Sequence, residues 1–359
     1  MIIRVLAALV LLIPSLASAQ DAAGPSLTEI TEAWLASPHA DRTSEAFTHW
    51  NEEEGGVPGA CAVCHSSIGL LEYLGSPMQT VGAIANAVPT GSVIGCASCH
   101  SAASAALTSV PFPSGVHLDV AAGSATCSVC HQGRASTGAV EAAIGGLAAD
   151  DVSPDLGFVN SHYAMAAATQ AGSAAHGGYE YPDRAYAGPF THFPDLNTCS
   201  SCHAPHGLQV ELSSCIGCHE GAESFTDIRT SPADFDGDGD VTEGIADPIA
   251  TLHARLDEAI ALYAAEVIGM PVIYAPGVYP YFFNDTNGDG ALSEGEAAFP
   301  NRYQSWSPRL LRAAYNYQYV RQDGGAFAHN PHYALQLLYD SLADLGAAVE
   351  VDITAYTRP

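Results

Sequence analysis

The chain has 359 residues, enough to bury a sizeable core and to form two or three domains. Its 11 basic residues are all arginine and are outnumbered by 39 acidic residues, which gives a formal net charge of -28. Such a chain repels phosphate backbones, so the composition excludes a nucleic-acid-binding protein. The acidity favours a basic partner or divalent cations, although it is equally explained as a means of keeping an exported protein soluble.

The first residues have the pattern of a secretory signal peptide. Arg4 precedes a long apolar run that ends in Ala-Ser-Ala at 17–19, the small-x-small pattern that signal peptidase cleaves. Residues 1–19 are therefore predicted to be removed. No later segment has eighteen uninterrupted apolar residues, and no cysteine follows the signal to carry a lipid. We expect an exported protein without a membrane span, in the periplasm or outside the cell.

Five copies of one pattern, Cys-x-x-Cys-His, use all ten cysteines. This is the attachment sequence of c-type haem, in which two thiols add to the vinyl groups and the adjoining histidine ligates the iron from one face. The spacing lets one turn of backbone reach both vinyl groups, so the sequence predicts five covalently bound haems. The residues are Cys61, Cys64 and His65; Cys96, Cys99 and His100; Cys127, Cys130 and His131; Cys199, Cys202 and His203; and Cys215, Cys218 and His219.

Other uses of paired cysteines agree less well with this pattern. Structural zinc requires four ligands, usually from two Cys-x-x-Cys pairs, and five pairs cannot be divided in this way without a remainder. Disulfide frameworks are common in exported chains, and thioredoxin-like motifs also contain Cys-x-x-Cys, but neither requires a histidine directly after every pair. Haem attachment explains the histidines, the complete use of the cysteines and the signal peptide together.

Each haem iron has a second axial position that the motif does not fill. Only five more histidines are needed to give every iron two histidine ligands. Methionine is an alternative, but after the initiator the chain holds only Met78, Met165 and Met270, so histidine is the more economical ligand. Any single histidine could equally be an ordinary surface or hydrogen-bonded residue. Those outside the motifs are His39, His49, His117, His162, His176, His192, His206, His253, His329 and His332.

The chain resembles the exported bacterial multihaem c-type cytochromes. CSSCHAPHGLQVELSSCIGCH, residues 199–219, is similar to the doubled motif of that family, in which a histidine three residues beyond the first motif ligates a neighbouring haem; this position is His206 here. FTHWNEEEGGVPGACAVCHSS, NSHYAMAAATQ, GGYEYPDRAYAGPFTHFPDLNTCSSCH and GGAFAHNPHYALQLLYDSLADLG are similar to segments that accompany such motifs. The resemblance implies that the distal ligands are His49, His162, His192, His206 and His329, with His117, His176, His253 and His332 in reserve.

Residues 20–225 are rich in Ala, Gly, Ser and Pro and show few sustained apolar periods. Five haems account for this deficit, because each is a large apolar body that replaces much of an ordinary side-chain core. We expect a pentahaem region of short helices and long irregular loops, and a mainly α protein with little β structure. The long interval between the third and fourth motifs is expected to wrap the haems, or else to form a small domain of its own.

The last third, residues 226–359, is predicted to be a helical, calcium-binding region packed on the haem region. An acidic loop lies near its start. DFDGDGDVTEGI, residues 234–245, places oxygen-bearing side chains at alternate positions of a twelve-residue loop of the EF-hand type. Position twelve is Ile245, so Glu243, Asp247 or another group must complete the ligand shell. The predicted ligands are Asp234, Asp236, Asp238 and Asp240.

Apolar residues in the last third recur at intervals of three and four, which is typical of amphipathic helices. Helices are predicted from Asp247 onwards, over 309–320 and over 334–345. The stripes cover either each other or the haem array, and only the second alternative would make His329 a ligand. Their apolar residues are Ile249, Leu252, Leu256, Ile260, Tyr263 and Val267 in the first helix and Leu335, Leu338, Leu342 and Leu345 in the last.

DTNGDGALSEGE, residues 285–296, fits the EF-hand-type loop along its whole length. Gly290 permits the sharp turn at position six, and Glu296 at position twelve can supply two oxygens. Hard oxygen donors at alternate positions suit calcium, although an acidic turn without metal is the simpler alternative. We expect a structural role for the ion. The predicted ligands are Asp285, Asn287, Asp289, Ala291, Ser293 and Glu296.

The favoured function is electron transfer by closely packed haems in a calcium-stabilised chain outside the cytoplasm. An iron with two histidine ligands cannot bind substrate, so we predict a protein that is not an enzyme and whose partners are redox proteins or extracellular electron acceptors. The surplus histidines also permit a filament, in which a histidine of one subunit ligates a haem of the next.

A haem reductase with one open iron is the alternative function. The chain matches the pentahaem nitrite reductases in haem number, but their catalytic haem uses a Cys-x-x-Cys-Lys motif, and this chain has no lysine. Another small-molecule reductase would need one haem without a distal ligand, which would give a high-spin spectrum.

Overall fold

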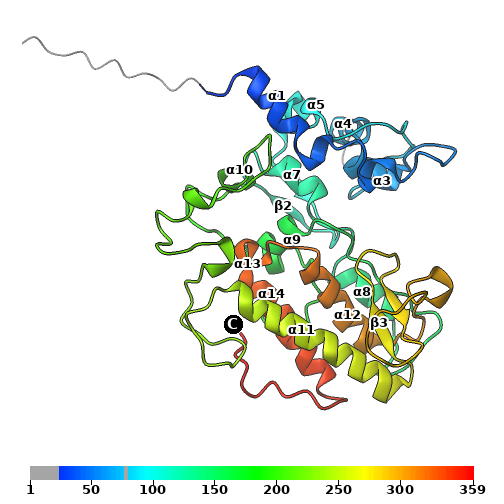
Figure 1. The fold of residues 1–359 in the computed structure, drawn as a ribbon. Helices are drawn as coiled ribbons and strands as arrows, with labels where there is room; N and C mark the ends of the chain where they lie inside the picture. Colours follow the sequence, from blue (N-terminus) through cyan, green and yellow to red (C-terminus); the bar gives the residue numbers. More distant parts are fainter. Residues whose placement is uncertain (1–23, 77–79) are drawn as a thin grey trace, which may run out of the picture.

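The structure, a computed structural model, describes residues 24–76 and 80–359 (Figure 1). The predicted signal peptide, residues 1–19, lies outside the described residues. Helices account for 40% of the described residues and strands for 5%, which confirms a mainly α protein with little β structure. None of the described helices combines the length and the apolar character needed to cross a bilayer.

Short helices carry the first part of the chain. Small polar side chains fix their ends: Ser66 accepts the backbone N–H groups of Ile68 and Gly69, and Ser101 accepts that of Ser104. These helices are α1 (Leu27–Leu35), α2 (Glu45–Thr48), α3 (Gly59–His65), α4 (Ser67–Gly75), α5 (Cys96–His100), α6 (Ala102–Ala106), α7 (Ala125–Cys130), α8 (Thr137–Ile144), α9 (Ala166–Ala171) and α10 (Cys199–Cys202).

Four of the Cys-x-x-Cys pairs lie on helices, namely on α3, α5, α7 and α10, and the fifth follows a 3-10 turn at Leu212–Ser214. Residues three apart lie on the same face of a helix, so the two thiols of a pair project to one side. In these four motifs the local structure therefore supplies the thiol geometry that attachment to a single macrocycle requires.

Two small antiparallel sheets complete the secondary structure. The strands β1 (Ser109–Pro111) and β2 (His117–Asp119) pair between the second and third motifs. The strands β3 (Val272–Tyr274) and β4 (Phe282–Asn284) pair beside the long C-terminal helices. Each strand has three residues, so each sheet joins only two short segments and does not form a layer of the fold.

Three long helices form the lower body of the molecule (Figure 1). They are α11 (Ala246–Tyr263), α12 (Pro308–Arg321) and α14 (Pro331–Leu345), and the short α13 (Ala326–His329) precedes α14. The leucine stripe predicted on 334–345 is wholly buried. The stripe of α11 is buried as far as Tyr263, but the prediction for Val267 is wrong: this residue is 40% exposed, on a π-helical turn at Ala264–Ile268.

The apolar stripes of the lower body cover each other, because α14 packs against both α11 and α12. At the same time, α13 packs against α9 in the motif-bearing part (Figure 1), and the ring of His329 at its end lies near that of His203. The two alternatives for these helices were therefore not exclusive: they bury one another and still deliver His329 to the motif region.

Buried amide side chains fasten the long interval between motifs three and four to α12. The Asn316 amide accepts the N–H of Tyr179 at 2.7 Å and donates to its carbonyl at 3.0 Å. Gln318 accepts the N–H of Ser161 at 3.0 Å. One buried apolar cluster runs from the helix of the first motif to the last helices, so it crosses the predicted boundary at residue 225. The boundary itself stays a prediction.

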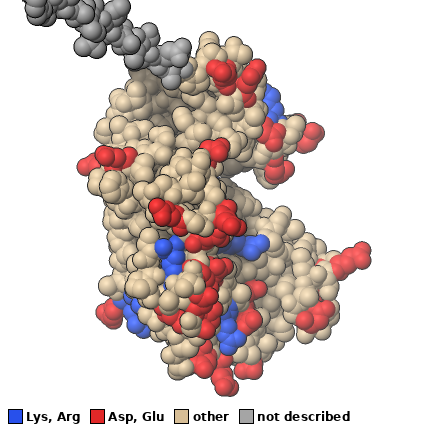
Figure 2. Space-filling view, turned by 60° about the vertical axis from the view of Figure 1, so that its left-hand side comes forward, with Lys and Arg blue, Asp and Glu red and all other residues tan. Residues whose placement is uncertain are grey.

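The surface is acidic and indented. Figure 2 shows acidic side chains spread over one face with few basic ones among them, and a hollow between the upper, motif-bearing part and the lower helical body. No basic patch that would suit a polyanion is visible on this face.

Candidate functional site

Each motif histidine lies opposite one histidine from elsewhere in the chain. The ring centroids of all these pairs are close to 6 Å apart, and no hydrogen bond joins the two rings of a pair in the described part of the chain. The rings are also not in contact: directly stacked rings such as His253 and Tyr317 have centroids only 4.1 Å apart. The pairs are His65 with His162 (6.0 Å), His100 with His206 (6.1 Å), His131 with His39 (6.2 Å), His203 with His329 (6.4 Å) and His219 with His192 (5.9 Å).

This separation fits a metal ion held between two imidazoles. Metal–imidazole bonds are about 2.0–2.1 Å long, and a ring centroid lies roughly 1 Å behind its nitrogen, so two imidazoles on opposite sides of one metal have centroids about 6 Å apart. The angles between the ring planes range from 15° for His100 and His206 to 74° for His65 and His162. Such variation is compatible with the fit, because each ring can rotate about its own metal–nitrogen bond.

Hydrogen bonds at Nδ1 orient three of these rings. His65 donates from Nδ1 to the carbonyl of Ala46 at 2.7 Å, and His203 donates to that of Leu208 at 3.0 Å. These acceptors fix the tautomer with the proton on Nδ1, which leaves the Nε2 lone pair free to bind iron. The residues present therefore fit a haem iron with two axial histidines.

The third of these rings, His329, is held by a carboxylate. Its Nδ1 lies 2.7 and 3.0 Å from the two oxygens of Asp323, a side chain that is 4% exposed. Burial by itself lowers the pKa of His329, but the hydrogen bond and charge of Asp323 outweigh it and raise the pKa. A carboxylate partner also makes the imidazole a stronger electron donor to a bound metal.

Burial keeps other paired rings neutral. Loss of hydration lowers the pKa of His131 to about 4 and that of His162 to about 4. It also lowers the pKa of His65 and of His39. A neutral imidazole keeps the lone pair that ligation requires. The ten cysteines are free thiols and none of them is fully buried, so they are available for thioether formation.

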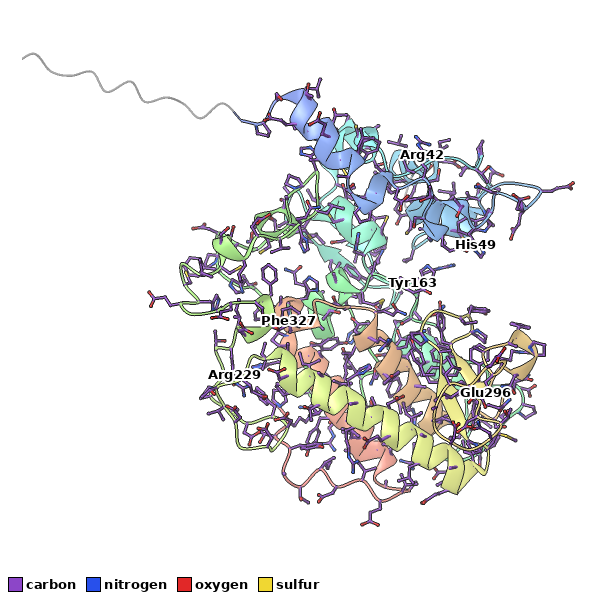
Figure 3. The ribbon with its side chains drawn as sticks, viewed as in Figure 1. Arg42, His49, Tyr163, Arg229, Glu296 and Phe327 are labelled. Atoms are coloured by element: carbon purple, nitrogen blue, oxygen red, sulfur yellow. The ribbon has the colours of Figure 1, made fainter. Side chains whose placement is uncertain are left out.

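The structure does not place His49 opposite a motif histidine. Its Nδ1 bonds to Glu45 at 2.7 Å, its ring meets Trp50 edge to face, and its side chain is 54% exposed at the outer edge of the motif region (Figure 3). His39 lies opposite His131 instead. His39 lies within a 3-10 turn, Pro38–Ala40, and its carbonyl accepts the N–H of Ile94. No local sequence signal predicts this contact between two distant segments.

The reserve histidines have other surroundings. His253 donates from Nε2 to the carbonyl of Tyr317 at 2.9 Å and stacks on that ring, so the nitrogen that would bind iron is already used. His176 bonds to Glu180, and His332 meets the edge of Phe235. His117 is exposed on β2. These residues have structural roles or face solvent.

In the loop 285–296, acidic side chains accept hydrogen bonds from backbone N–H groups of the same loop. Asp285 accepts the N–H groups of Gly288 at 2.7 Å and Gly290 at 2.9 Å, and both glycines have positive φ. Glu296 folds back to accept from Thr286 and Ser293. The loop follows β4 and not a helix, so it is an EF-hand-type loop without the helix–loop–helix frame.

The loop 234–245 gathers three carboxylates. Ligand oxygens of Asp234, Asp236 and Asp238 lie within 4.8 Å of one another. Asp236 is 6% exposed, and its Oδ1 has no hydrogen-bond partner among the described residues. Asp240 instead closes a turn by accepting from Thr242 at 2.7 Å, so its side chain does not belong to the gathered set.

Glu243 faces this carboxylate group from position ten. Burial, followed by the charges of Asp236, Asp238 and Asp247, raises the pKa of Glu243 to about 7. Its Oε1 has no hydrogen-bond partner among the described residues and lies 3.6 Å from Arg229. Ile245 at position twelve is buried in the core. Arg229 and Glu296 mark the two acidic loops on opposite sides of the helical body (Figure 3).

Comparison with known proteins identifies relatives that match most of the chain. The chain is 28% identical, over 88% of its length, to the C-type polyheme cytochrome OmcC of Geobacter sulfurreducens, and 27% identical over the same share to the C-type polyheme cytochrome OmcB of that species. It spans about half the length of these curated relatives, 47% of OmcC and 49% of OmcB. No family model and no solved structure matches. This likeness supports a multihaem c-type cytochrome.

Proposed function

We propose that the protein is an extracytoplasmic pentahaem c-type cytochrome in which every iron has two histidine ligands. The observation that carries this proposal is the set of five histidine pairs, each joining one motif histidine to one other histidine at about 6 Å. The proposed distal ligands are His39, His162, His192, His206 and His329, with His39 taking the place predicted for His49.

The residues of each site have separate tasks. The two thiols of a motif fix the macrocycle to the backbone, the motif histidine binds one face, and the distal histidine closes the other. When attached, the haems supply reversible one-electron couples. Closure of both faces keeps substrates from the metal, so the chain performs outer-sphere electron transfer and not bond-making chemistry. Carboxylates such as Asp323 stabilise the more positive, oxidised state of the metal.

Mass and spectra test this proposal in the full chain produced by a host that attaches haem. We expect the mature mass to exceed the polypeptide mass by five haems and the electron paramagnetic resonance spectrum to contain only low-spin ferric signals. A mass without five haems contradicts the proposal. A high-spin signal from one fifth of the iron would instead favour the reductase, although the opposing histidine at every motif argues against an open iron.

The histidine pairs bear on assembly as well. All five motif histidines have a partner within one chain, which supports a carrier whose ligation does not depend on a second subunit. A filament would then be held by surface contacts and not by ligation in trans. Redox proteins or extracellular acceptors are the proposed partners, and the acidic surface favours partners with a basic docking face.

We also propose two structural calcium sites. In the loop 285–296, Asp285 and Glu296 are buried carboxylates at positions one and twelve, as in calcium loops of the EF-hand type. In the loop 234–245, the unpaired Oδ1 of Asp236 and the facing Glu243 supply the closure that Ile245 cannot. A divalent cation would relieve the repulsion among these carboxylates.

A further inference from the structure

The first and third motifs meet directly, although the second motif separates them in sequence. Helices α3 and α7 pack against each other, and the thiol of Cys130 lies 3.8 Å from the carbonyl of Val63. The thiols of Cys130 and Cys64 lie side by side. A thioether sulfur is bonded to a carbon on the porphyrin rim, so neighbouring sulfurs bring the rims of two macrocycles close together.

The third motif also meets the fourth through its other cysteine. The backbone N–H of Cys199 donates to Ser124 Oγ at 2.9 Å, and the thiol of Cys199 lies beside that of Cys127. The two thiols of one motif therefore face thiols of two different motifs.

The second motif borders the third on the distal side. The N–H of Ile94, just before this motif, donates to the carbonyl of His39 at 3.1 Å, and His39 lies opposite His131. The second motif also touches the segment after the first, where Ser98 donates to Ser67 at 3.0 Å.

The fifth motif follows the fourth within one short folded module. In this module the backbone N–H of Ala204 donates to the carbonyl of Gln209 at 2.8 Å. The distal histidine of the fifth motif, His192, comes from the segment that leads into this module.

We propose that the third motif, residues 127–131, is the branch point of the haem array, with the first, second and fourth motifs as its neighbours and the fifth reached through the fourth. This inference depends on the proposed five haems and adds their connectivity. An electron that leaves a ferrous iron at the branch point reduces a ferric iron at any of three neighbours, so one chain offers several exits. A linear array, in which each haem neighbours only the haems of the adjacent motifs in the sequence, would lack the contact between Cys64 and Cys130. The branched array requires this contact.

Nuclear Overhauser spectra of the fully reduced, diamagnetic chain test this contact without any mutation. We expect cross-peaks between the thioether groups at Cys64 and Cys130 and between those at Cys127 and Cys199. Cross-peaks that join only consecutive motifs, with none between Cys64 and Cys130, would overturn the branch point. That result would leave five low-spin haems in place, so it differs from failure of the proposed function, which appears in the mass and the Soret absorption.

A redox titration resolved haem by haem gives a second test. In His39→Met, the methionine ligand makes the third haem easier to reduce, and its added electron shifts the midpoints of neighbouring haems to lower potential. We expect shifts at the first, second and fourth haems and none at the fifth. The matched variant His192→Met should shift only the fourth haem besides its own. An unmoved first haem in His39→Met contradicts the branch point.

Discussion

Residues 24–225 and the three long C-terminal helices are built in different ways. The first region has short helices, many glycines with positive φ and histidine rings held about 6 Å apart, a gap that only an inserted group would bridge. The C-terminal body has leucine and tyrosine side chains that are wholly buried against one another. If the proposed haems are bound, the first region takes part of its order from them in addition to its buried side chains, whereas the C-terminal body takes its order from its own side chains.

The physical difference lies in what covers the apolar surface. A buried leucine contributes about 1.5–3 kcal/mol by leaving water, and α14 provides four such leucines on one stripe. The motif helices are too short to form such stripes, since isolated helices of this length are unstable. In the proposed haem-loaded protein, thioether bonds within each motif and metal bonds from distant histidines would add stability here, in the way that metal sites stabilise small domains.

The largest expected effect comes from preventing haem attachment. A chain expressed without its signal sequence in a compartment that does not attach haem should lose amide protection over residues 24–225 by about 100-fold or more, the change that ~3 kcal/mol of local stability produces. Helices α11, α12 and α14 should keep more of theirs. Hydrogen exchange with mass spectrometry on both forms measures this. Equal loss of protection in both regions would refute the contrast.

A core substitution probes the other half. Leu338→Ala should lower the free energy of unfolding of the haem-loaded protein by about 3 kcal/mol, within the usual 2–5 kcal/mol for a buried leucine, because Leu338 is 0% exposed. Denaturant titration followed by circular dichroism measures it, and the Soret band of the folded protein should not change. Leu27→Ala, at a position 79% exposed, is the control and should alter stability by less than about 0.5 kcal/mol.

The ligand assignment can be sharpened with a pair of variants. His39→Ala should convert one of five haems to a five-coordinate, high-spin state, because His39 is the ring opposite His131. His49→Ala should leave all haems low-spin, because His49 faces Glu45 and Trp50. Electron paramagnetic resonance separates the two states. The reverse pattern would restore His49 as the ligand.

Calcium binding should depend on one carboxylate in each acidic loop. Glu296→Gln and Glu243→Gln should each weaken one calcium site at least tenfold, about 1.4 kcal/mol, because each removes a charge that faces its loop. Glu294→Gln, an exposed neighbour, is the control and should bind as the natural chain does. Isothermal titration of the chelator-treated protein measures both sites. Undiminished binding in Glu243→Gln would show that the loop 234–245 is closed by another group.

The smallest expected effect concerns the midpoint potential of a single haem. Asp323→Asn removes the charge that His329 meets through Nδ1, so the midpoint of the fourth haem should rise by ~40 mV, the equivalent of about 1 kcal/mol for one electron. The exposed Asp352→Asn should leave all midpoints in place. Spectroelectrochemistry with ligand-sensitive detection distinguishes the two. An unchanged midpoint would leave Asp323 with an orienting role alone.

Some features of the site and the fold could be predicted because they depend on residues that are close together in the sequence. Attachment of haem needs two thiols and an imidazole within five residues, so the motifs are complete in the sequence. The helices α11, α12 and α14 follow from apolar spacing, and their bounds agree with the predicted ranges within a few residues. The acidic loops are likewise recognised from alternate oxygen donors within twelve residues.

Only the tertiary structure could decide which distant groups meet. Nothing near His39 distinguishes it from His49, and its place opposite His131 depends on a backbone contact with Ile94 far along the chain. In the same way, Glu243 faces Asp236 only because of how its loop is buried. The sequence by itself determined the chemistry that each segment carries, because bonding geometry acts over a few residues. Chain folding decided which histidine lies opposite each motif histidine, because a distal ligand is selected by proximity in space.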